Sequence, residues 1–178
     1  MAVQNQPDNY NTLSPLSFRL VIDQFPLLTF WCQSANIPGI TVAESTSPNP
    51  LRDIPMMGDK VEYETLDVTM IVDEDLANYR EILGWIRGQS PDQKQTDHKE
   101  YLEQNPRRRQ LPFSSTYERY LSDAVLHITT NSKGSNKTVT FKDIFPVSLG
   151  ALAFDSTAEL TPITTDISFQ IRDYIIDG

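Results

Sequence analysis

The stretch that decides the fold is VEYETLDVTMIVDEDLANYREILGWIRG, residues 61–88, because its hydrophobic period changes within it. From Leu66 to Val72 every second residue is apolar, which is the pattern of a half-buried β-strand. From Leu76 to Ile86 the apolar residues recur at helical spacing instead. The stretch therefore predicts a strand that leads directly into an amphipathic helix.

The expected helix carries its own start and stop signals. Asp73, Glu74 and Asp75 supply a cap and first-turn negative charge, and Gly88 follows the last turn. The side chains expected to pack on the strands are Leu76, Tyr79, Leu83 and Ile86, widened by Ile82 and Trp85. Such a helix must lie on something apolar, and the remaining strands are the only candidate.

Upstream of this strand the alternation has the opposite phase. Val61 and Tyr63 are apolar there, and Glu62 lies between them. The phase slips near Glu64–Thr65, where we expect a bulge or a sharp bend.

The N-terminal part of the chain predicts an arm, a hairpin and a long loop. Residues 1–17 are polar and contain two prolines, as in a flexible arm. Residues 18–22 and 28–32 alternate around a short turn and predict a β-hairpin. Residues 41–58 hold three prolines and Gly58, which predicts a long loop, and loops of this length are usually functional.

The C-terminal half predicts strands separated by turns. Residues 89–122 are hydrophilic and predict a long insertion loop, and residues 143–150 predict a compact turn. Strands are expected over residues 125–130, 138–142, 151–155 and 163–175. Together these elements predict a mainly β (α+β) fold: an antiparallel sandwich or partial barrel with one flanking helix, in a single domain spanning residues 1–178.

Composition excludes several classes of function. The chain is 39% hydrophobic and 22% charged, as in globular domains, and has no apolar run long enough to span a bilayer. The N-terminus lacks the basic and apolar regions of a signal peptide. The net charge of −9 argues against a surface that grips nucleic acid. It is compatible with a protein past which DNA moves without sticking.

No constellation in the sequence supports catalysis, a metal or a cofactor. The two histidines, His98 and His127, have no partner at metal-ligand spacing, and Cys32 ends an apolar strand face as a small hydrophobe. The acidic run Asp73–Asp75 could hold a cation, but helix capping accounts for it. A hydrolase using Glu62 and Glu64 lacks a general acid–base pair.

Several motifs, in this order, resemble the tail tube proteins of contractile-tailed bacteriophages. They are Phe18-x-Leu20-x-Ile22, Phe30-x-Cys32, Ile37-Pro38-Gly39, Gly58-Asp59, Tyr63-x-x-Leu66-x-Val68, Val72-Asp73-Glu74-Asp75, Trp85-Ile86, the block Phe141 to Gly150 and Phe154-Asp155. The match covers most of residues 16–176.

This resemblance implies a structural subunit of the virion, assembled in the host cytoplasm. Family members form hexameric rings that stack into a hollow tube for DNA, with a tail sheath and a baseplate as partners. The insertion at residues 89–122 is long and basic for a plain tube subunit, so a baseplate tube initiator or a tail terminator remains an alternative. A tube protein of a contractile injection system, a class the resemblance implies to have the same fold, is a further alternative. A different class, a monomeric module that binds a ligand through its loops, also remains open.

The tube hypothesis assigns roles to named residues. The candidate inter-subunit residues are Leu51, Arg52, Ile54, Met56, Arg107, Arg108 and Arg109. The strands of residues 61–72 and 163–176 are expected to join neighbouring subunits into a continuous barrel. A DNA conduit should have an acidic lining, because basic groups would bind the phosphates. The candidate lumen-facing residues are Glu62, Glu64, Asp67 and Asp166.

Overall fold

The structure, a computed structural model, describes residues 13, 16–90, 99, 103, 120–129, 136–155 and 161–177. Its elements are β1 Phe18–Ile22, α1 Leu28–Trp31, β2 Cys32–Ala35, β3 Ile40–Ser47, β4 Ile54–Tyr63, β5 Leu66–Ile71, α2 Ala77–Gln89, β6 Ser122–Thr129, β7 Asn136–Leu149, β8 Thr164–Gln170 and β9 Asp173–Asp177. Most of the expected arm, residues 1–17, and of the expected insertion, residues 89–122, lies outside the described residues.

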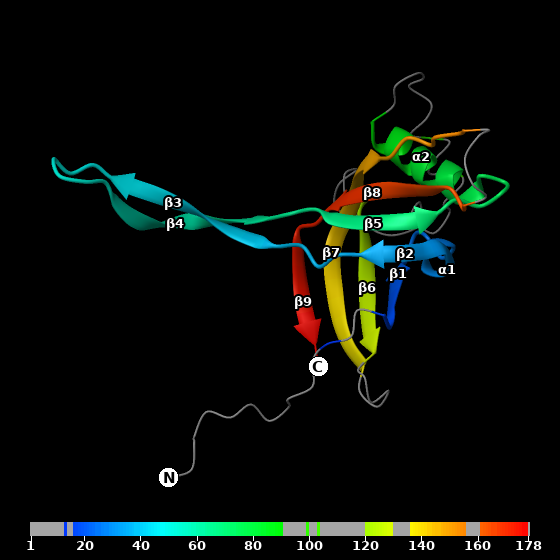
Figure 1. The fold of residues 1–178 in the computed structure, drawn as a ribbon, viewed down its shortest axis with the longest axis horizontal. Helices are drawn as coiled ribbons and strands as arrows, with labels where there is room; N and C mark the ends of the chain where they lie inside the picture. The colour runs from blue at the N-terminus through cyan, green and yellow to red at the C-terminus, as the bar shows by residue number, and fades with distance from the viewer. Residues whose placement is uncertain are drawn as a thin grey trace, which may run out of the picture.

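Seven strands form one bent antiparallel sheet in the order β1-β6-β7-β8-β5-β2, with β9 also paired to β7. The long strand β7 belongs to both sides of the bend. Up to Ile144 it pairs with β6 and β9, whereas Phe145–Leu149 pairs with β8. We call β1, β6, β9 and the first part of β7 half A, and β2, β5, β8 and the last part of β7 half B. In Figure 1 the strands of half B run across those of half A, an orthogonal packing that confirms the mainly β fold with a flanking helix.

A corner stabilised by polar contacts marks the bend. Asp143 has a left-handed backbone with φ 53°, and its N–H donates to Asp123 Oδ1 at 3.1 Å. Arg172, between β8 and β9, pairs with the Asp143 carboxylate at 2.6 Å, and its N–H donates to Lys142 O at 3.2 Å. The chain therefore passes from one half to the other twice at the same place.

Three C-terminal expectations are wrong because of this corner. Residues 143–150 do not form a turn but continue β7 as far as Leu149. The single strand expected over residues 163–175 is divided into β8 and β9, and residues 151–155 form no strand. Alternation predicts extended backbone, but it does not show where a strand changes neighbours.

The expected hairpin of residues 18–22 and 28–32 is also wrong. Strand β1 pairs with β6, and β2 pairs with β5, so the two segments lie in different halves. The short helix α1 lies between them and buries Leu28. Phe25, in the intervening turn, stacks on Trp85 with ring centroids 5.4 Å apart. Core packing of this turn replaces the strand pairing that the local pattern suggested.

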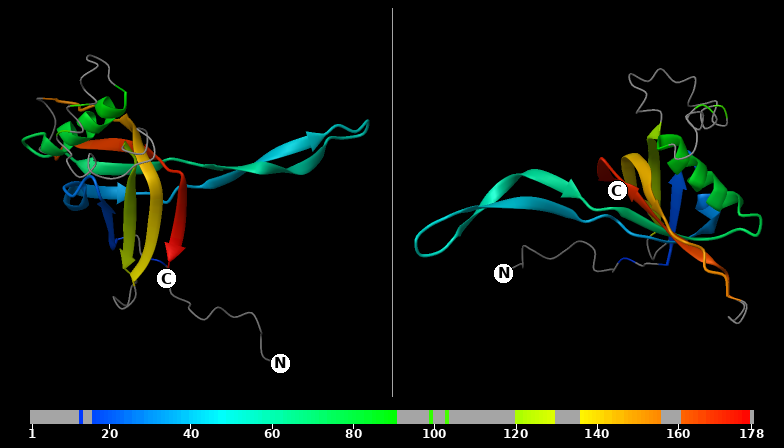
Figure 2. Two further views of the ribbon diagram at one scale, coloured as in Figure 1. Left: turned by 180° about the vertical axis from the view of Figure 1, so that it is seen from behind. Right: turned by 90° about the horizontal axis from the view of Figure 1, so that it is seen from above.

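The core is built from side chains of both halves and of α2, and Figure 2 shows α2 lying against the bent sheet. Trp85 is fully buried and lies 6.0 Å from Phe169 of β8, centroid to centroid. Its indole N–H donates to Tyr120 O at 2.8 Å, so the buried polar atom has a partner. The apolar face of half B therefore faces α2, as the sequence predicted.

The start of α2 differs from the expectation. The helix begins at Ala77 after Leu76, which adopts a left-handed conformation with φ 54°, and no acidic residue lies in the first turn. Asp73–Asp75 therefore do not cap it. Instead the buried Asn78 accepts N–H groups of Asp73 and Tyr79 at 3.2 and 2.8 Å and donates to Ile71 O at 2.8 Å. This amide joins the helix to the end of β5.

The predicted face of α2 is confirmed for Ile82, Trp85, Tyr79 and Ile86, which are buried in the core or pack partly buried against it, but not for Leu76 and Leu83. Its fully buried positions are Asn78, Ile82, Trp85 and Gly88. Leu76 is exposed, and Leu83 is half-buried on the side that borders an open surface hollow. The helix runs on through Gly88, so that glycine does not end it.

Strands β3 and β4 pair only with each other among the described residues and project far from the body (Figure 1). We call them the ribbon. Residues 41–58, expected to be a loop, form most of it. The phase slip at Glu64–Thr65 is the point where β4 ends and β5 begins in the other sheet. The slip marks a change of sheet along a chain that keeps nearly the same direction.

Candidate functional site

Half B exposes one polar face. Leu66, Val68 and Met70 of β5 point into the core, so the alternate positions point away from it. In the β5–β8 pair, Asp67 lies opposite Ser168 and Thr69 lies opposite Asp166. The Thr69 hydroxyl donates to Asp166 Oδ1 at 2.7 Å. We call Asp67, Thr69, Asp166 and Ser168 the polar face.

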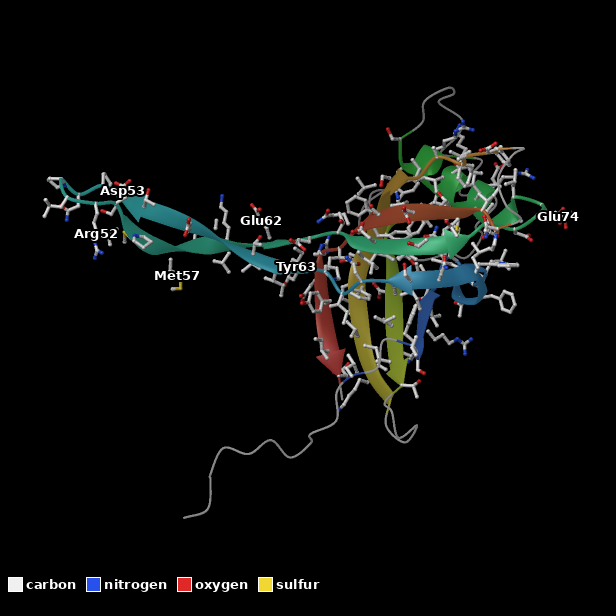
Figure 3. The ribbon with its side chains drawn as sticks, viewed as in Figure 1. Arg52, Asp53, Met57, Glu62, Tyr63 and Glu74 are labelled. Carbon is white, nitrogen blue, oxygen red and sulfur yellow. The ribbon has the colours of Figure 1, made fainter. Side chains whose placement is uncertain are left out.

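The polar face brings together two of the four predicted lumen residues. Asp67 and Asp166 are both exposed on it, and the same phase of β5 and β8 carries no Lys or Arg. Glu62 lies elsewhere, on the ribbon opposite Thr41 (Figure 3), and Glu64 follows the last residue of β4, at the ribbon's base. At the ribbon's base the backbone N–H of Glu64 donates to Gly39 O at 3.0 Å. The structure therefore gives a smaller acidic cluster than the sequence suggested.

The ribbon exposes apolar side chains on a structure too thin to bury them. Leu51 and Met57 are 95% and 93% exposed, and a two-stranded ribbon alone is marginally stable in water. The predicted contact residues Leu51, Arg52, Ile54 and Met56 all lie here, and Figure 3 shows Arg52 near the tip. Sequence reasoning missed Met57, Val42 and Val61, which only the strand pairing identifies. Arg107, Arg108 and Arg109 lie outside the described residues.

The shape of the ribbon depends on Gly58. The pairing of β3 with β4 is irregular between Val42 and Glu44. A Cβ atom on Gly58 would lie 1.7 Å from the carbonyl oxygen of Ala43. The strands approach so closely at this bulge that only glycine fits.

The base of the ribbon is tied to β9. The Tyr63 hydroxyl donates to Asp173 Oδ1 at 2.9 Å, a contact that raises the pKa of Tyr63. The ring of Tyr63 packs edge-on against Tyr174 with centroids 5.8 Å apart, and the Gln170 amide donates to Tyr63 O at 3.4 Å. These contacts set the direction in which the ribbon leaves the body.

The described residues offer surfaces rather than reaction chemistry. No three of their His, Cys, Asp and Glu side chains gather closely enough to hold a metal ion. His127 is half-buried on β6, and His98 lies outside the described part. Burial raises the pKa of the Cys32 thiol to about 11, which keeps it neutral near pH 7. Within the described ranges no helix has the length and apolarity to cross a membrane.

Comparisons with known proteins agree with this picture. The profile of the phage tail tube protein family matches residues 9–177. No curated protein matches the sequence significantly. A chain from the sheath–tube complex of an extracellular contractile injection system (PVC, extended state) is similar in structure, with a TM-score of 0.53 and 14% identity over 95% of this chain and 93% of that one. The tube-terminating cap of the anti-feeding prophage has a TM-score of 0.55 and 13% identity over 99% of both chains.

Proposed function

Because the chain belongs to the phage tail tube protein family, we propose that it assembles into hexameric rings stacked as a conduit for DNA. The family makes it a structural subunit of the virion tail tube and not an enzyme. The observation that carries the finer proposal is the combination of a two-faced sheet and a projecting ribbon in one chain. The sheet lines the channel, and the ribbon connects rings.

Half B suits the channel wall because its polar face repels DNA without binding it. DNA carries one negative charge per roughly 1.7 Å of helix axis, so lysines or arginines in a narrow tube would hold it. Asp67 and Asp166 carry the same sign as the phosphates, while Thr69 and Ser168 are neutral. In a closed barrel of tilted strands one phase faces inward and the other packs outward. The apolar phase already packs on the core.

The ribbon suits a contact between rings because of its direction. It leaves the body at the start of β5 and extends along the strand direction of half B (Figure 1). When the strands of half B line a channel, they are tilted relative to its axis, and a ribbon that continues their direction extends beyond the ring and reaches the adjacent one. Its exposed Leu51 and Met57 bury apolar surface there.

Further partners follow from the same proposal. A tail sheath surrounds the tube, and a baseplate holds its first ring, with Arg107–Arg109 contacting a neighbouring or acidic surface. A terminator ring is the second candidate function, favoured by the similarity to a tube-terminating cap over 99% of both chains. Purified rings of a tube subunit should extend into tubes of indefinite length, whereas rings of a terminator should not.

The test shortens the ribbon while keeping its base. Val42 and Val61 are directly opposite, so residues 43–60 can be replaced by an Asn-Gly turn that leaves Tyr63 and Asp173 in place. We expect this variant to form rings but no tubes in electron micrographs. The control, Ile176→Ser, removes an exposed apolar side chain from β9, away from the ribbon, and should form tubes.

Two outcomes contradict the proposal. Wild-type protein that stays monomeric at high concentration would favour the ligand-binding module instead. Tubes of normal length from the shortened variant would show that the ribbon is not needed for ring stacking. The proposal that the chain forms rings would be unaffected.

A further inference from the structure

The ribbon has two unlike faces. Successive side chains of a strand point to opposite sides, and residues paired across two strands share a side. Near its base the ribbon is therefore mostly apolar on one side and mostly polar on the other. Figure 3 shows Met57 and Glu62 extending from opposite sides. The first side, which we call the apolar face, carries Ile40, Val42, Glu44, Met57, Val61 and Tyr63. The opposite face carries Thr41, Ser45, Met56 and Glu62.

The apolar face is exposed in the subunit. Among the described residues, β3 and β4 pair only with each other. Val42 and Val61 are each 53% exposed, and Met57 is 93% exposed. When the ribbon lies on an adjacent ring, a mostly apolar face gains more from burial than a mostly polar one. The apolar face is therefore the docking face, and Met57 has the most surface left to cover.

The thioether of Met57 is the chemically sensitive group on this face. Hydrogen peroxide transfers one oxygen atom to a methionine sulfur and leaves as water, and the product is the polar sulfoxide. Because the reaction requires access to the sulfur, Met57 reacts faster than Met56, and the fully buried Met70 is protected. Burial raises the pKa of the Cys32 thiol to about 11, so little of the reactive thiolate is present to compete.

We propose that Met57 is a redox-sensitive contact, whose oxidation to the sulfoxide by a peroxide prevents the apolar face of the ribbon from docking on the adjacent ring. The inference rests on the proposed stacking of rings through the ribbon. A sulfoxide oxygen buried in an apolar contact loses its hydrogen bonds to water, so the oxidised ribbon docks more weakly. In a finished tube the same sulfur is covered. Oxidation therefore stops the growth of new tubes and spares existing ones.

Peroxide treatment of the unassembled protein tests the proposal. The treated protein should still form rings, but the concentration needed for tubes should rise by at least about tenfold, because burial of a methionine side chain contributes roughly one to two factors of ten. Met57→Leu keeps the size and apolarity of the side chain but has no sulfur, so peroxide should leave its tube formation unchanged. The matched control, Met56→Leu, retains Met57 and should be as sensitive as wild type.

Two further measurements do not depend on the variants. Treatment of the oxidised wild-type protein with both methionine sulfoxide reductases, one for each sulfoxide epimer, and a dithiol as reductant should restore Met57 and tube formation together. In finished tubes, mass spectrometry should show that peroxide converts Met57 at least about tenfold more slowly than in the free subunit. Met56, on the opposite face, should be protected less.

The outcomes that overturn the inference differ from those that overturn the proposed function. Unchanged tube formation by wild-type protein whose Met57 is fully converted to the sulfoxide refutes the redox-sensitive contact alone. Loss of tubes from peroxide-treated Met57→Leu, or loss of rings from treated wild type, would place the damage elsewhere and also refutes it. Equal protection of Met56 and Met57 in tubes would refute the assigned docking face. Untreated wild-type protein that forms no tubes would refute the proposed stacking, and the inference with it.

Discussion

Replacing Ile82 by Ala tests how α2 is oriented on the sheet. Ile82 is fully buried in the core, and the change removes three carbon atoms and leaves a closed cavity. Substitutions of this kind lower the free energy of unfolding by about 2–5 kcal/mol. In a chain of this length each kcal/mol lowers the melting temperature by about 2–4 °C, so a fall of roughly 4–20 °C is expected.

The matched control is Leu83→Ala on the next residue. It removes the same number of carbon atoms, but Leu83 is half-buried and borders a hollow open to solvent. Because no closed cavity remains, the free energy of unfolding falls only by the contribution of the apolar surface that is no longer buried, about 1 kcal/mol. Sequence periodicity had placed Leu83 rather than Ile82 at the centre of the contact.

The assay is urea unfolding followed by tryptophan fluorescence and circular dichroism. Wild type and both variants must be compared at one protein concentration and in one oligomeric state, because assembly adds to apparent stability. The difference in free energy comes from the shift in midpoint at constant slope. A loss for Leu83→Ala equal to or larger than that for Ile82→Ala would refute the orientation of α2.

Three further predictions concern the corner, the polar face and the thiol. Asp143→Ala should lower the free energy of unfolding by about 1–2 kcal/mol in urea titrations, because its left-handed backbone disfavours Ala, and a gain in stability would contradict this. Rings of the double variant Asp67→Lys/Asp166→Lys should retain DNA fragments on a filter at low salt, whereas rings of the control variant Asp177→Lys should not. Equal retention by the two variants would show that the polar face does not line the channel. A pKa of about 11, raised from 9.0, lowers the Cys32 thiolate fraction about 100-fold at pH 8, and its greater nucleophilicity offsets part of this, so alkylation should be about tenfold slower than for an unfolded chain. Because the pKa is raised, the burial of the neutral Cys32 thiol stabilises the fold fully below the pKa of the unfolded chain, and this stabilisation is lost as the pH rises through the pKa of the folded protein. Alkylation as fast as in urea would contradict the burial of the thiol.

Local pattern was sufficient for individual elements and insufficient for their partners. The alternation from Leu66 to Val72 correctly predicted β5, and the opposite phase around Tyr63 correctly indicated a change at Glu64–Thr65. Pairing of β1 with β6, over a hundred residues away, leaves no mark near Phe18. The short spacing between the first two apolar segments therefore suggested a hairpin that core packing of Phe25 prevents.

The candidate site was predictable to a similar extent. Charge alternation correctly placed Asp67 and Asp166 on an exposed face, because they lie on strands whose other face is strongly apolar. For Glu62 the alternation carries no such information, because its strand has no buried face. That these residues face a channel stays a prediction. The helix face was predicted correctly for Tyr79, Ile82, Trp85 and Ile86. It was wrong for Leu76 and Leu83, because Asn78, a polar residue, is buried as the joint to β5 and shifts the contact toward Ile82.

The continuity of the ribbon with β5 has a mechanical consequence. Hydrogen bonds between antiparallel strands lie perpendicular to the strands, so tension along β4 reaches β5 parallel to its axis. Such a load stretches all the bonds from β5 to β2 and to β8 together, in shear, instead of opening them one at a time. A subunit pulled by its ribbon would therefore resist with the whole of half B, while the same strands peeled from an edge would separate bond by bond.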